Sequence, residues 1–305
     1  MIAATTVRAG IAAALALGVA AALGGCSSND PTQSDASSDA STIVVGSQQY
    51  YSNEIIAELY AQVLEKDGFT VERNYQIGQR EIYLPQMQKG KIDVLPEYSG
   101  NLLQYYDADS TAATPSEIAD GLGSALPSGI RALTAAPATD QDSYTVTKAF
   151  SQENDVTSLA DLSKVSDPLT VGANSEFAKR PYGPPGLKSE YGVDVDLTAI
   201  EDSGGALTVK ALKDGTVQLA DIYSADPSIK ANGFVTLKDP KNLILPQNVT
   251  PIVSKKVDAK AEADIDAVDK VLTTDALITL NTQSTVDKEK ASTIAKRFLT
   301  RKGLL

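Results

Sequence analysis

Short β-rich runs alternate with segments of helical periodicity along the chain from residue 41 onward. Residues 41–46 (STIVVG) and 69–75 (FTVERNY) have the composition of strands, and residues 52–68 between them place apolar side chains at helical spacing. Residues 80–90 (REIYLPQMQKG) predict a second helix that bends at its proline, and residues 91–97 (KIDVLPE) return as a strand. This order of strands and helices predicts a parallel sheet with helices on its faces.

A second set of alternating segments follows farther along the chain. Strands are expected at residues 167–174, 195–202 and 216–224, and helices at residues 157–165, 184–192 and 204–215. Further helical patterns cover residues 115–126, 266–280 and 288–303. The two sets predict an α/β protein with two lobes of similar build, and ligand sites in such proteins lie at the carboxyl ends of strands and between domains.

Residues 1–26 have the features of a secretory signal. Arg8 precedes an apolar run at residues 9–25, which is short for a membrane-spanning helix. The run ends in LGGC, which resembles a bacterial lipobox, and Cys26 is the only cysteine in the chain. We expect Cys26 to be the lipidated first residue of the mature protein. The alternative is an uncleaved membrane helix with a free thiol.

Residues 27–41 are rich in serine and aspartate and contain almost no apolar side chain. Such a segment cannot bury enough surface to offset its loss of conformational entropy, so we expect a disordered tether. The folded part is then expected to begin near Thr42, which leaves about 260 residues for one large or two ordinary domains.

The composition removes several kinds of chemistry. The 305 residues include no histidine and a single cysteine, which leaves no Ser-His-Asp triad, no histidine metal site and no cysteine zinc cluster. A formal net charge of -12 argues against nucleic acid as a partner. We expect no cofactor and no metal. An enzyme is disfavoured, although chemistry with a pair of carboxylates such as Glu97 and Asp142 stays open.

Three tyrosines follow or flank expected strands at comparable places. Tyr98 lies in VLPEYSGN, Tyr223 lies in DIYSADPSI, and Tyr144 lies in DQDSYTVTK near the junction of the two sets. Any one of them could pack against its own lobe. Together, the faces of several tyrosines can surround a quaternary ammonium cation, which has no hydrogen-bond donor to offer.

Four segments in the same order resemble a known family. They are GSQQYYSNEIIAELYAQVLE, QIGQREIYLPQMQKGKIDVLPEYSGNLLQYY, SEFAKRPYGPPGLKSEYG and VQLADIYSAD. The resemblance is to substrate-binding proteins of osmoprotectant ABC transporters of the ProX and OpuC type, which bind glycine betaine, carnitine or choline. It spans roughly residues 42–300.

The resemblance implies a type II periplasmic-binding-protein fold whose two lobes close on the ligand. Each lobe would hold a mixed, mainly parallel sheet flanked by helices. The first lobe would comprise residues 42–146 and 248–305, and the second lobe residues 147–247. Hinge strands are expected near Ser143–Thr147 and Val249–Val253.

The resemblance also implies positions for the ligand contacts. In the family an aromatic box holds the trimethylammonium head, a polar residue lines the same pocket, and an arginine meets the ligand carboxylate. The matching residues are Tyr98, Tyr144 and Tyr223 for the box, Asp142 for the polar position and Arg180 for the arginine. A guanidinium suits a carboxylate because it donates two parallel hydrogen bonds. The alternative for Arg180 is a surface salt bridge, for example with Glu176.

Three positions depart from the family pattern. Asn248 takes the place of a fourth box tyrosine, Gln48 replaces a lysine, and Asn101 replaces a threonine. These changes remove one aromatic face and one positive charge, so the affinity for glycine betaine is expected to be lower. Candidates to fill the gap are Tyr50, Tyr51, Tyr105 and Tyr106.

These observations predict an extracytoplasmic receptor that binds a glycine-betaine-like solute and delivers it to the permease of an ABC importer. It would catalyse no reaction, and lipidated Cys26 would anchor it to the cell membrane. Three alternatives stay open: a receptor of the same fold for another polar or aromatic ligand, an envelope enzyme, and a scaffold lipoprotein whose cleft binds nothing.

Overall fold

The computed structural model describes residues 42–305. The expected signal peptide, the lipidation of Cys26 and the tether lie outside the described residues. Within residues 42–305 no helix combines the length and the apolar character needed to cross a membrane.

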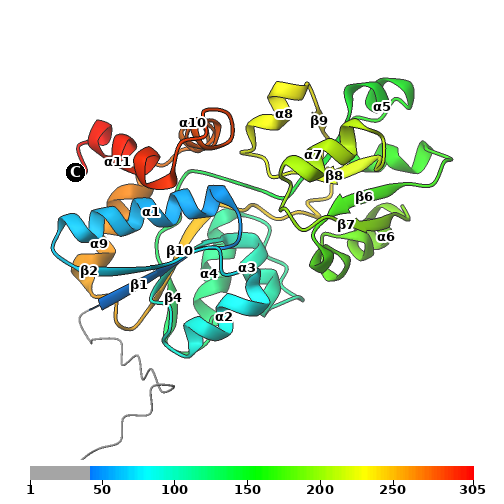
Figure 1. The fold of residues 1–305 in the computed structure, drawn as a ribbon. Helices are drawn as coiled ribbons and strands as arrows, with labels where there is room; N and C mark the ends of the chain where they lie inside the picture. Colours follow the sequence, from blue (N-terminus) through cyan, green and yellow to red (C-terminus); the bar gives the residue numbers. More distant parts are fainter. Residues whose placement is uncertain (1–41) are drawn as a thin grey trace, which may run out of the picture. The chain divides into compact units, whose positions relative to one another are not determined.

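Five strands form a first sheet in the order β2-β1-β3-β10-β4 (Figure 1). They are β1 (Thr42–Gly46), β2 (Thr70–Asn74), β3 (Val94–Tyr98), β4 (Ile130–Ala132) and β10 (Val249–Ser254). β1 is parallel to β2 and β3, whereas β10 is antiparallel to β3 and β4. We call this sheet and its helices the first lobe.

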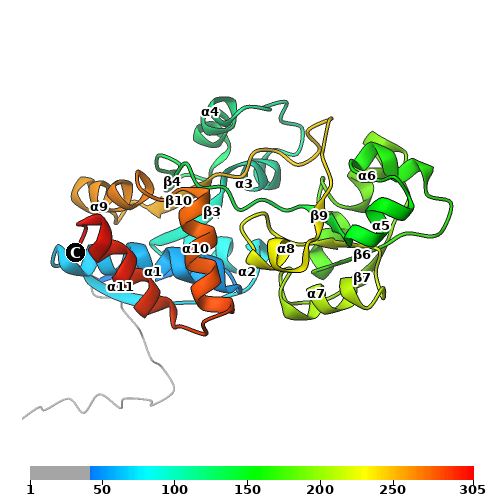
Figure 2. The ribbon, with the colours of Figure 1, turned by 90° about the horizontal axis from the view of Figure 1, so that it is seen from above.

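Helices cover both faces of the first sheet. They are α1 (Tyr51–Lys66), α2 (Arg80–Gln88), α3 (Ser99–Tyr106), α4 (Pro115–Ala125), α9 (Ala259–Asp269), α10 (Thr274–Thr285) and α11 (Ala291–Lys302). Neighbouring side chains of a strand point to opposite faces. Val94 therefore packs with α1 and the C-terminal helices, whereas Leu95 packs with α2, α3 and α4. α11 lies beside α1 (Figure 2).

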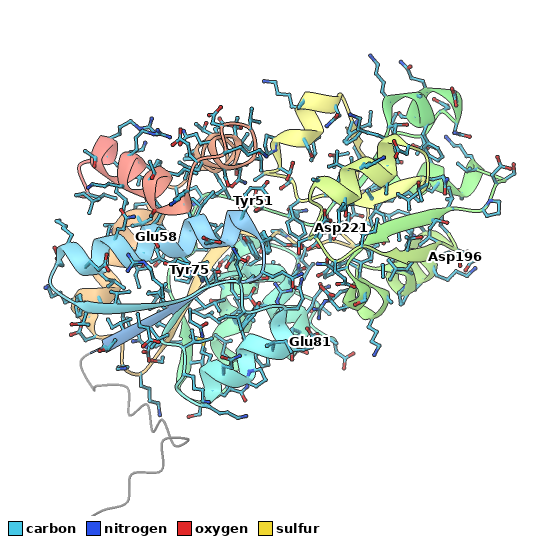
Figure 3. The ribbon with its side chains drawn as sticks, in the orientation of Figure 1. Tyr51, Glu58, Tyr75, Glu81, Asp196 and Asp221 are labelled. Atoms are coloured by element: carbon cyan, nitrogen blue, oxygen red, sulfur yellow. The ribbon has the colours of Figure 1, made fainter. Side chains whose placement is uncertain are left out.

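Glu58 of α1 ties this helix to the edge strand β2 (Figure 3). Its carboxylate accepts hydrogen bonds from Arg73 Nε at 2.9 Å and from the Tyr75 hydroxyl at 2.7 Å. Burial alone would raise the pKa of Glu58, but the hydrogen bonds from Arg73 and its neighbours outweigh burial and the pKa is lowered. These contacts fix α1 against β2, two elements that the sequence pattern predicts.

A second sheet has the order β7-β6-β8-β5-β9. Its strands are β5 (Tyr144–Val146), β6 (Thr170–Ala173), β7 (Asp196–Ala199), β8 (Leu219–Asp221) and β9 (Val235–Thr236). β6 is parallel to β7 and β8, and β5 is antiparallel to β8 and β9. The flanking helices are α5 (Lys148–Glu153), α6 (Pro184–Tyr191), α7 (Ala206–Lys213), α8 (Pro227–Asn232) and two 3-10 helices, η1 (Leu159–Lys164) and η2 (Ser175–Lys179). We call this group the second lobe.

Residues 144–146 belong to the second sheet, because β5 pairs with β8 and β9. The expected lobe boundary after residue 146 is therefore too late in the chain. The first crossover runs from β4 to β5, and the return runs from β9 to β10. The pairing of β5 decides this boundary, because a three-residue strand carries no local signal for which sheet it joins.

Two helices differ from the sequence prediction. In the expected helix at residues 157–165, Leu159–Lys164 form the 3-10 helix η1, and at its start Asp161 Oδ2 accepts hydrogen bonds from the Ser158 N–H at 3.0 Å and hydroxyl at 2.8 Å. The expected helix at residues 266–280 is two helices, α9 and α10. The break is at Thr273, whose hydroxyl accepts from the Ala276 N–H at 3.2 Å and caps α10.

Candidate functional site

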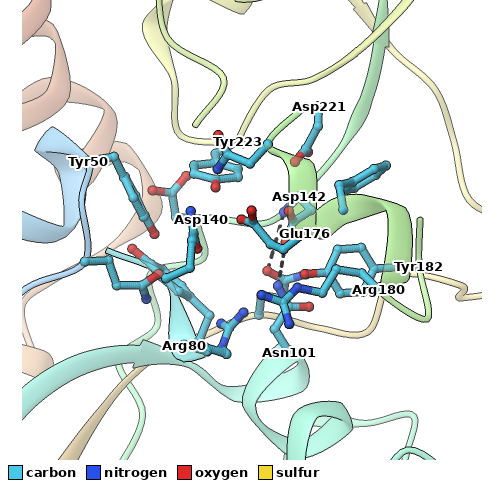
Figure 4. A pocket seen from close by; sticks show the side chains of 16 residues that line it. Tyr50, Arg80, Asn101, Asp140, Asp142, Glu176, Arg180, Tyr182, Asp221 and Tyr223 are labelled. Carbon is cyan, nitrogen blue, oxygen red and sulfur yellow. Dashed lines mark hydrogen bonds between the residues drawn. The ribbon is translucent and has the colours of Figure 1, made fainter. Parts of the chain in front are cut away.

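The strand ends of both lobes meet at one pocket, a cavity of about 30 Å³ (Figure 4). Most of its lining comes from the segments after β1, β2, β3, β6 and β8, that is, from the carboxyl ends of strands, and the segments before β5 and β10 supply the rest. This is where open α/β sheets place their ligands.

Three tyrosines form one wall of the pocket. Tyr50 precedes α1, Tyr98 ends β3, and Tyr223 follows β8. The ring centroids of Tyr50 and Tyr98 are 6.3 Å apart at an interplanar angle of 24°, and those of Tyr50 and Tyr223 are 4.9 Å apart at 59°. Burial raises the pKa of Tyr50 and of Tyr223 well above the ordinary value, so both phenols stay neutral.

A second aromatic surface comes from the segment after β6. Phe177 and Tyr182 line the pocket with ring centroids 5.8 Å apart at 70°. Both residues lie in SEFAKRPYG, which forms η2 and the turn before α6. The pocket thus has aromatic faces from both lobes.

The structure does not place Tyr144 in the pocket lining, contrary to the expectation. Its ring packs against Phe177 at 5.7 Å and is 1% exposed, and its hydroxyl donates to the Tyr182 carbonyl oxygen at 2.9 Å. Tyr144 therefore supports the Phe177 and Tyr182 surface from behind. Strand β5 directs the ring into the core of the second lobe, where its hydroxyl finds a buried acceptor.

Asn248 is also outside the pocket lining, and Gln247 takes its place. The Asn248 side-chain amide donates to the Ala136 carbonyl oxygen at 3.0 Å, in a separate groove beside α4 and β4. Gln247 lines the pocket and is 1% exposed. Adjacent side chains of extended backbone point to opposite sides. The side chain of Gln247 therefore faces the pocket, and that of the next residue, Asn248, faces away from it.

Unpaired amide groups line the pocket. Gln48 Nε2, Gln79 Nε2, Gln247 Nε2 and Asn101 Oδ1 are buried without a hydrogen-bond partner among the described residues. Buried polar groups normally have partners, so these atoms indicate that the pocket receives a polar ligand or water.

Arg80 and Glu97 form a buried ion pair at the base of the pocket. Arg80 Nε and Nη2 donate to the two carboxylate oxygens of Glu97 at 2.8 Å each, and both side chains are almost fully enclosed. The Glu97 carboxylate also accepts from the Tyr83 hydroxyl and from the Tyr98 N–H. Both carboxylate oxygens of Glu97 therefore accept hydrogen bonds within the protein, and neither is free to act on a substrate together with Asp142.

Arg180 lines the pocket but pairs with Glu81 rather than with Glu176. Its Nη1 and Nη2 donate to the two oxygens of Glu81 at 2.9 and 3.2 Å. Glu81 belongs to α2 of the first lobe and Arg180 follows η2 of the second, so this pair joins the lobes. Burial alone would raise the pKa of Glu81, but the hydrogen bonds from Arg180 lower it.

Acidic side chains from both sides also face the pocket. They are Asp140, Asp142, Glu176 and Asp221. Asp140 accepts from the Ser52 hydroxyl at 2.8 Å and from the Ala225 N–H at 3.0 Å, and burial raises its pKa to about 7. Ser52 lies in the first turn of α1, and its hydroxyl donates to this carboxylate.

Asp142 and Asp221 are neighbours in this acidic group. Asp142 accepts a hydrogen bond from Asn101 Nδ2 at 2.5 Å (Figure 4). Asp142 lies in the segment between β4 and β5, and Asn101 belongs to α3. Burial and the charge of Asp142 raise the pKa of Asp221 well above the ordinary aspartate value. Among residues 42–305, no three acidic or cysteine side chains are arranged to hold a metal ion.

Residues 41–301 match the family described as the substrate binding domain of an ABC-type glycine betaine transport system. The chain belongs to this family. It is 28% identical over 231 residues to the glycine betaine-binding protein YehZ of Escherichia coli strain K12, which covers 72% of this chain and 75% of the relative.

Solved structures show the same fold. A structure of a glycine betaine/carnitine/choline ABC transporter protein has a TM-score of 0.68 at 19% identity and covers 86% of this chain and 99% of that chain. Apo YehZ from Escherichia coli has a TM-score of 0.61 at 25% identity, covering 87% of this chain and 100% of that chain. The predicted family and the two-lobed type II fold are confirmed, and the chain is a substrate-binding protein of an ABC transport system.

The pocket of this substrate-binding protein contains most of the side chains that the sequence singled out. The structure brings together Tyr98, Tyr223, Arg180, Asp142, Gln48 and Asn101. The lining residues that the sequence reasoning missed are Gln79, Arg80, Asp140, Asn174, Glu176, Phe177, Tyr182, Asp221 and Gln247, and Tyr50 was left as one of four candidates. The segment SEFAKRPYG carried a usable signal, since two aromatic side chains flank its arginine.

Proposed function

We propose that this chain binds a quaternary-ammonium solute in the pocket and delivers it to the permease of an ABC importer, without catalysing a reaction. The observation that carries the proposal is a pocket with aromatic faces from both lobes and carboxylates around them. Tyr50, Tyr98 and Tyr223 offer π faces on one side, and Phe177 and Tyr182 offer them on the other. Such faces attract a cation that cannot form hydrogen bonds.

Contacts between the lobes support closure around the ligand. Gln49 Nε2 donates to the Ser203 hydroxyl at 3.1 Å, and the Tyr51 hydroxyl donates to Asp226 at 2.6 Å. Both contacts join the start of the first lobe to the second lobe near the pocket. Hinge closure of this kind sequesters a small ligand in two-lobed binding proteins. The names of the relatives, glycine betaine-binding protein in Escherichia coli and in Pseudomonas aeruginosa, agree with this ligand class.

A thermal-shift screen of the purified protein tests the proposal. The panel is glycine betaine, proline betaine, choline and carnitine, with several amino acids for comparison. A true ligand at one hundred times its dissociation constant adds about 2.7 kcal/mol to the free energy of unfolding. Tyr98→Ala should lower affinity about tenfold or more, because a desolvated cation–π contact is lost. The matched control is Tyr105→Ala, which removes a tyrosine that is 37% exposed and outside the pocket lining.

The outcomes separate the remaining alternatives. A shift with amino acids alone would identify a receptor of the same fold for another ligand. No shift with any compound would favour a scaffold role and contradict the proposal.

We further propose that the protein is extracytoplasmic and anchored to the cell membrane by lipidated Cys26. The lipobox-like LGGC and the following serine-rich segment support this location. Detergent phase partition of the protein from its native cells, with mass spectrometry of the N-terminal peptide, tests it. An unmodified Cys26 or recovery in the aqueous phase would contradict the anchor.

A further inference from the structure

Both arginines that line the pocket are already neutralised by glutamates of the same protein. Arg80 is held by Glu97, and Arg180 is held by Glu81, each through two hydrogen bonds to the carboxylate oxygens. The Arg180 side chain is only 12% exposed, so its guanidinium has little contact with water. A ligand carboxylate that approaches Arg180 must therefore displace Glu81 or share the guanidinium with it.

The pocket also holds four carboxyl groups outside these two ion pairs. None of Asp140, Asp142, Glu176 and Asp221 forms a salt bridge within residues 42–305. Burial raises the pKa of Asp140, Glu176 and Asp221, which means that their surroundings in the protein disfavour the charged forms. A bound cation would lower these pKa values by favouring the charged carboxylates, whereas a ligand carboxylate would raise them further.

We propose that Glu81 is a specificity-determining residue: by occupying Arg180 it makes the pocket prefer a solute with a net positive charge and no carboxylate over a zwitterion. This inference rests on the proposed function. In the class of quaternary-ammonium solutes, choline represents the first kind and glycine betaine the second. The unpaired amides of Gln48, Gln79 and Gln247 can donate hydrogen bonds to a ligand hydroxyl as well as to a ligand carboxylate. The net charge of the ligand therefore distinguishes choline from glycine betaine.

The location of Glu81 makes it suited to this role. It lies in the first turn of α2, next to Arg80, and its side chain is 47% exposed. It is outside the pocket lining itself, so it acts on the ligand through Arg180. Because Glu81 belongs to the first lobe and Arg180 to the second, the pair spans the two lobes beside the pocket.

The test measures the dissociation constants of choline and glycine betaine for four proteins by calorimetry. These are the wild type, Glu81→Gln, Glu81→Gln combined with Arg180→Gln, and the control Glu72→Gln. Glu72 lies on β2, is exposed, and gives the same change in net charge without touching the pocket. The ratio of the two constants is the readout, since any effect on lobe closure is common to both ligands.

We expect the wild type to bind choline at least about tenfold more tightly than glycine betaine, because pairing of a carboxylate with a free guanidinium is a strong, charge-assisted interaction that Glu81 prevents. Glu81→Gln should shift the ratio about tenfold toward glycine betaine, and the added Arg180→Gln should remove that gain. The control should keep the wild-type ratio. Circular dichroism and melting temperatures confirm that each variant is folded, and Glu81→Ala serves as a second variant with the same expected shift.

Two results would overturn the inference. If both ligands bind but Glu81→Gln and Glu72→Gln have equal ratios, or if the wild type prefers glycine betaine, Glu81 does not set the selectivity and the proposed function stands. If neither compound binds to any of the four proteins, the proposed function fails together with the inference.

Discussion

Replacing Arg80 by methionine isolates the buried ion pair beneath the pocket. Methionine keeps much of the length and apolar stem of arginine but removes the guanidinium. Four donors reach the Glu97 carboxylate: Arg80 Nε, Arg80 Nη2, the Tyr83 hydroxyl and the Tyr98 N–H. The substitution leaves two of these four donors and no opposite charge, while the Glu97 side chain is 0% exposed.

The expected loss follows from the burial of this pair. Removing one partner of a buried ion pair costs about 3–5 kcal/mol, because the remaining charge stays away from water without compensation. That is a large part of the roughly 5–15 kcal/mol by which a domain is stable. The double variant Arg80→Met with Glu97→Gln should recover at least about 1 kcal/mol, because the uncompensated charge is gone.

Urea unfolding of the ligand-free protein, followed by circular dichroism, measures both values as changes in midpoint at constant slope. The control is Lys188→Met, which removes an exposed pair with Asp194 at 2.5 Å and should change stability by less than about 1 kcal/mol. A loss in Arg80→Met no larger than that in Lys188→Met would refute the reasoning, since burial would then add nothing to the pair.

Two further predictions concern the pocket and the contact between α3 and the segment before β10. Asp140 has a folded pKa of about 7, above the roughly 3.9 of unfolded aspartate, so its contribution is complete below about pH 4 and is lost as the pH rises toward 7. Asp140→Asn should flatten the fall in melting temperature over that window, and coincident profiles would contradict this. In Gly100→Ala the new Cβ would meet the Pro246 carbonyl oxygen at 2.6 Å and Leu245 Cβ at 2.7 Å, so we expect a loss of about 1–3 kcal/mol by urea unfolding. Gly123→Ala, where nothing lies within 4 Å, should be neutral or stabilising, and equal losses in the two variants would show that the contact is not limiting.

The sequence predicted the order of strands and helices well because that signal is local. The alternating residues 69–75 became β2, and the helical periodicity of residues 52–68 became α1. Two expected helices differ in detail. Residues 159–164 form the 3-10 helix η1, and the expected helix at residues 266–280 is divided where Thr273 caps α10.

The candidate site was predictable where a residue follows a strand directly. Tyr98 ends β3 and Tyr223 follows β8, so both face the region where strand carboxyl ends converge. Tyr144 and Asn248 were misplaced for a different reason. Whether Tyr144 faces the pocket or the core depends on how β5 joins the second sheet, and a one-residue change of phase exchanges Asn248 for Gln247.

The sequence alone determined the class of fold, the family and the aromatic character of the site, because strand and helix periods and short motifs are written within a few residues of one another. Only the tertiary structure decided which charges neutralise each other in the pocket. Arg180 meets Glu81 across 99 positions of the chain, and Asn101 meets Asp142 across 41. Such pairs depend on how the two sheets bring distant loops together, and no local pattern specifies that geometry.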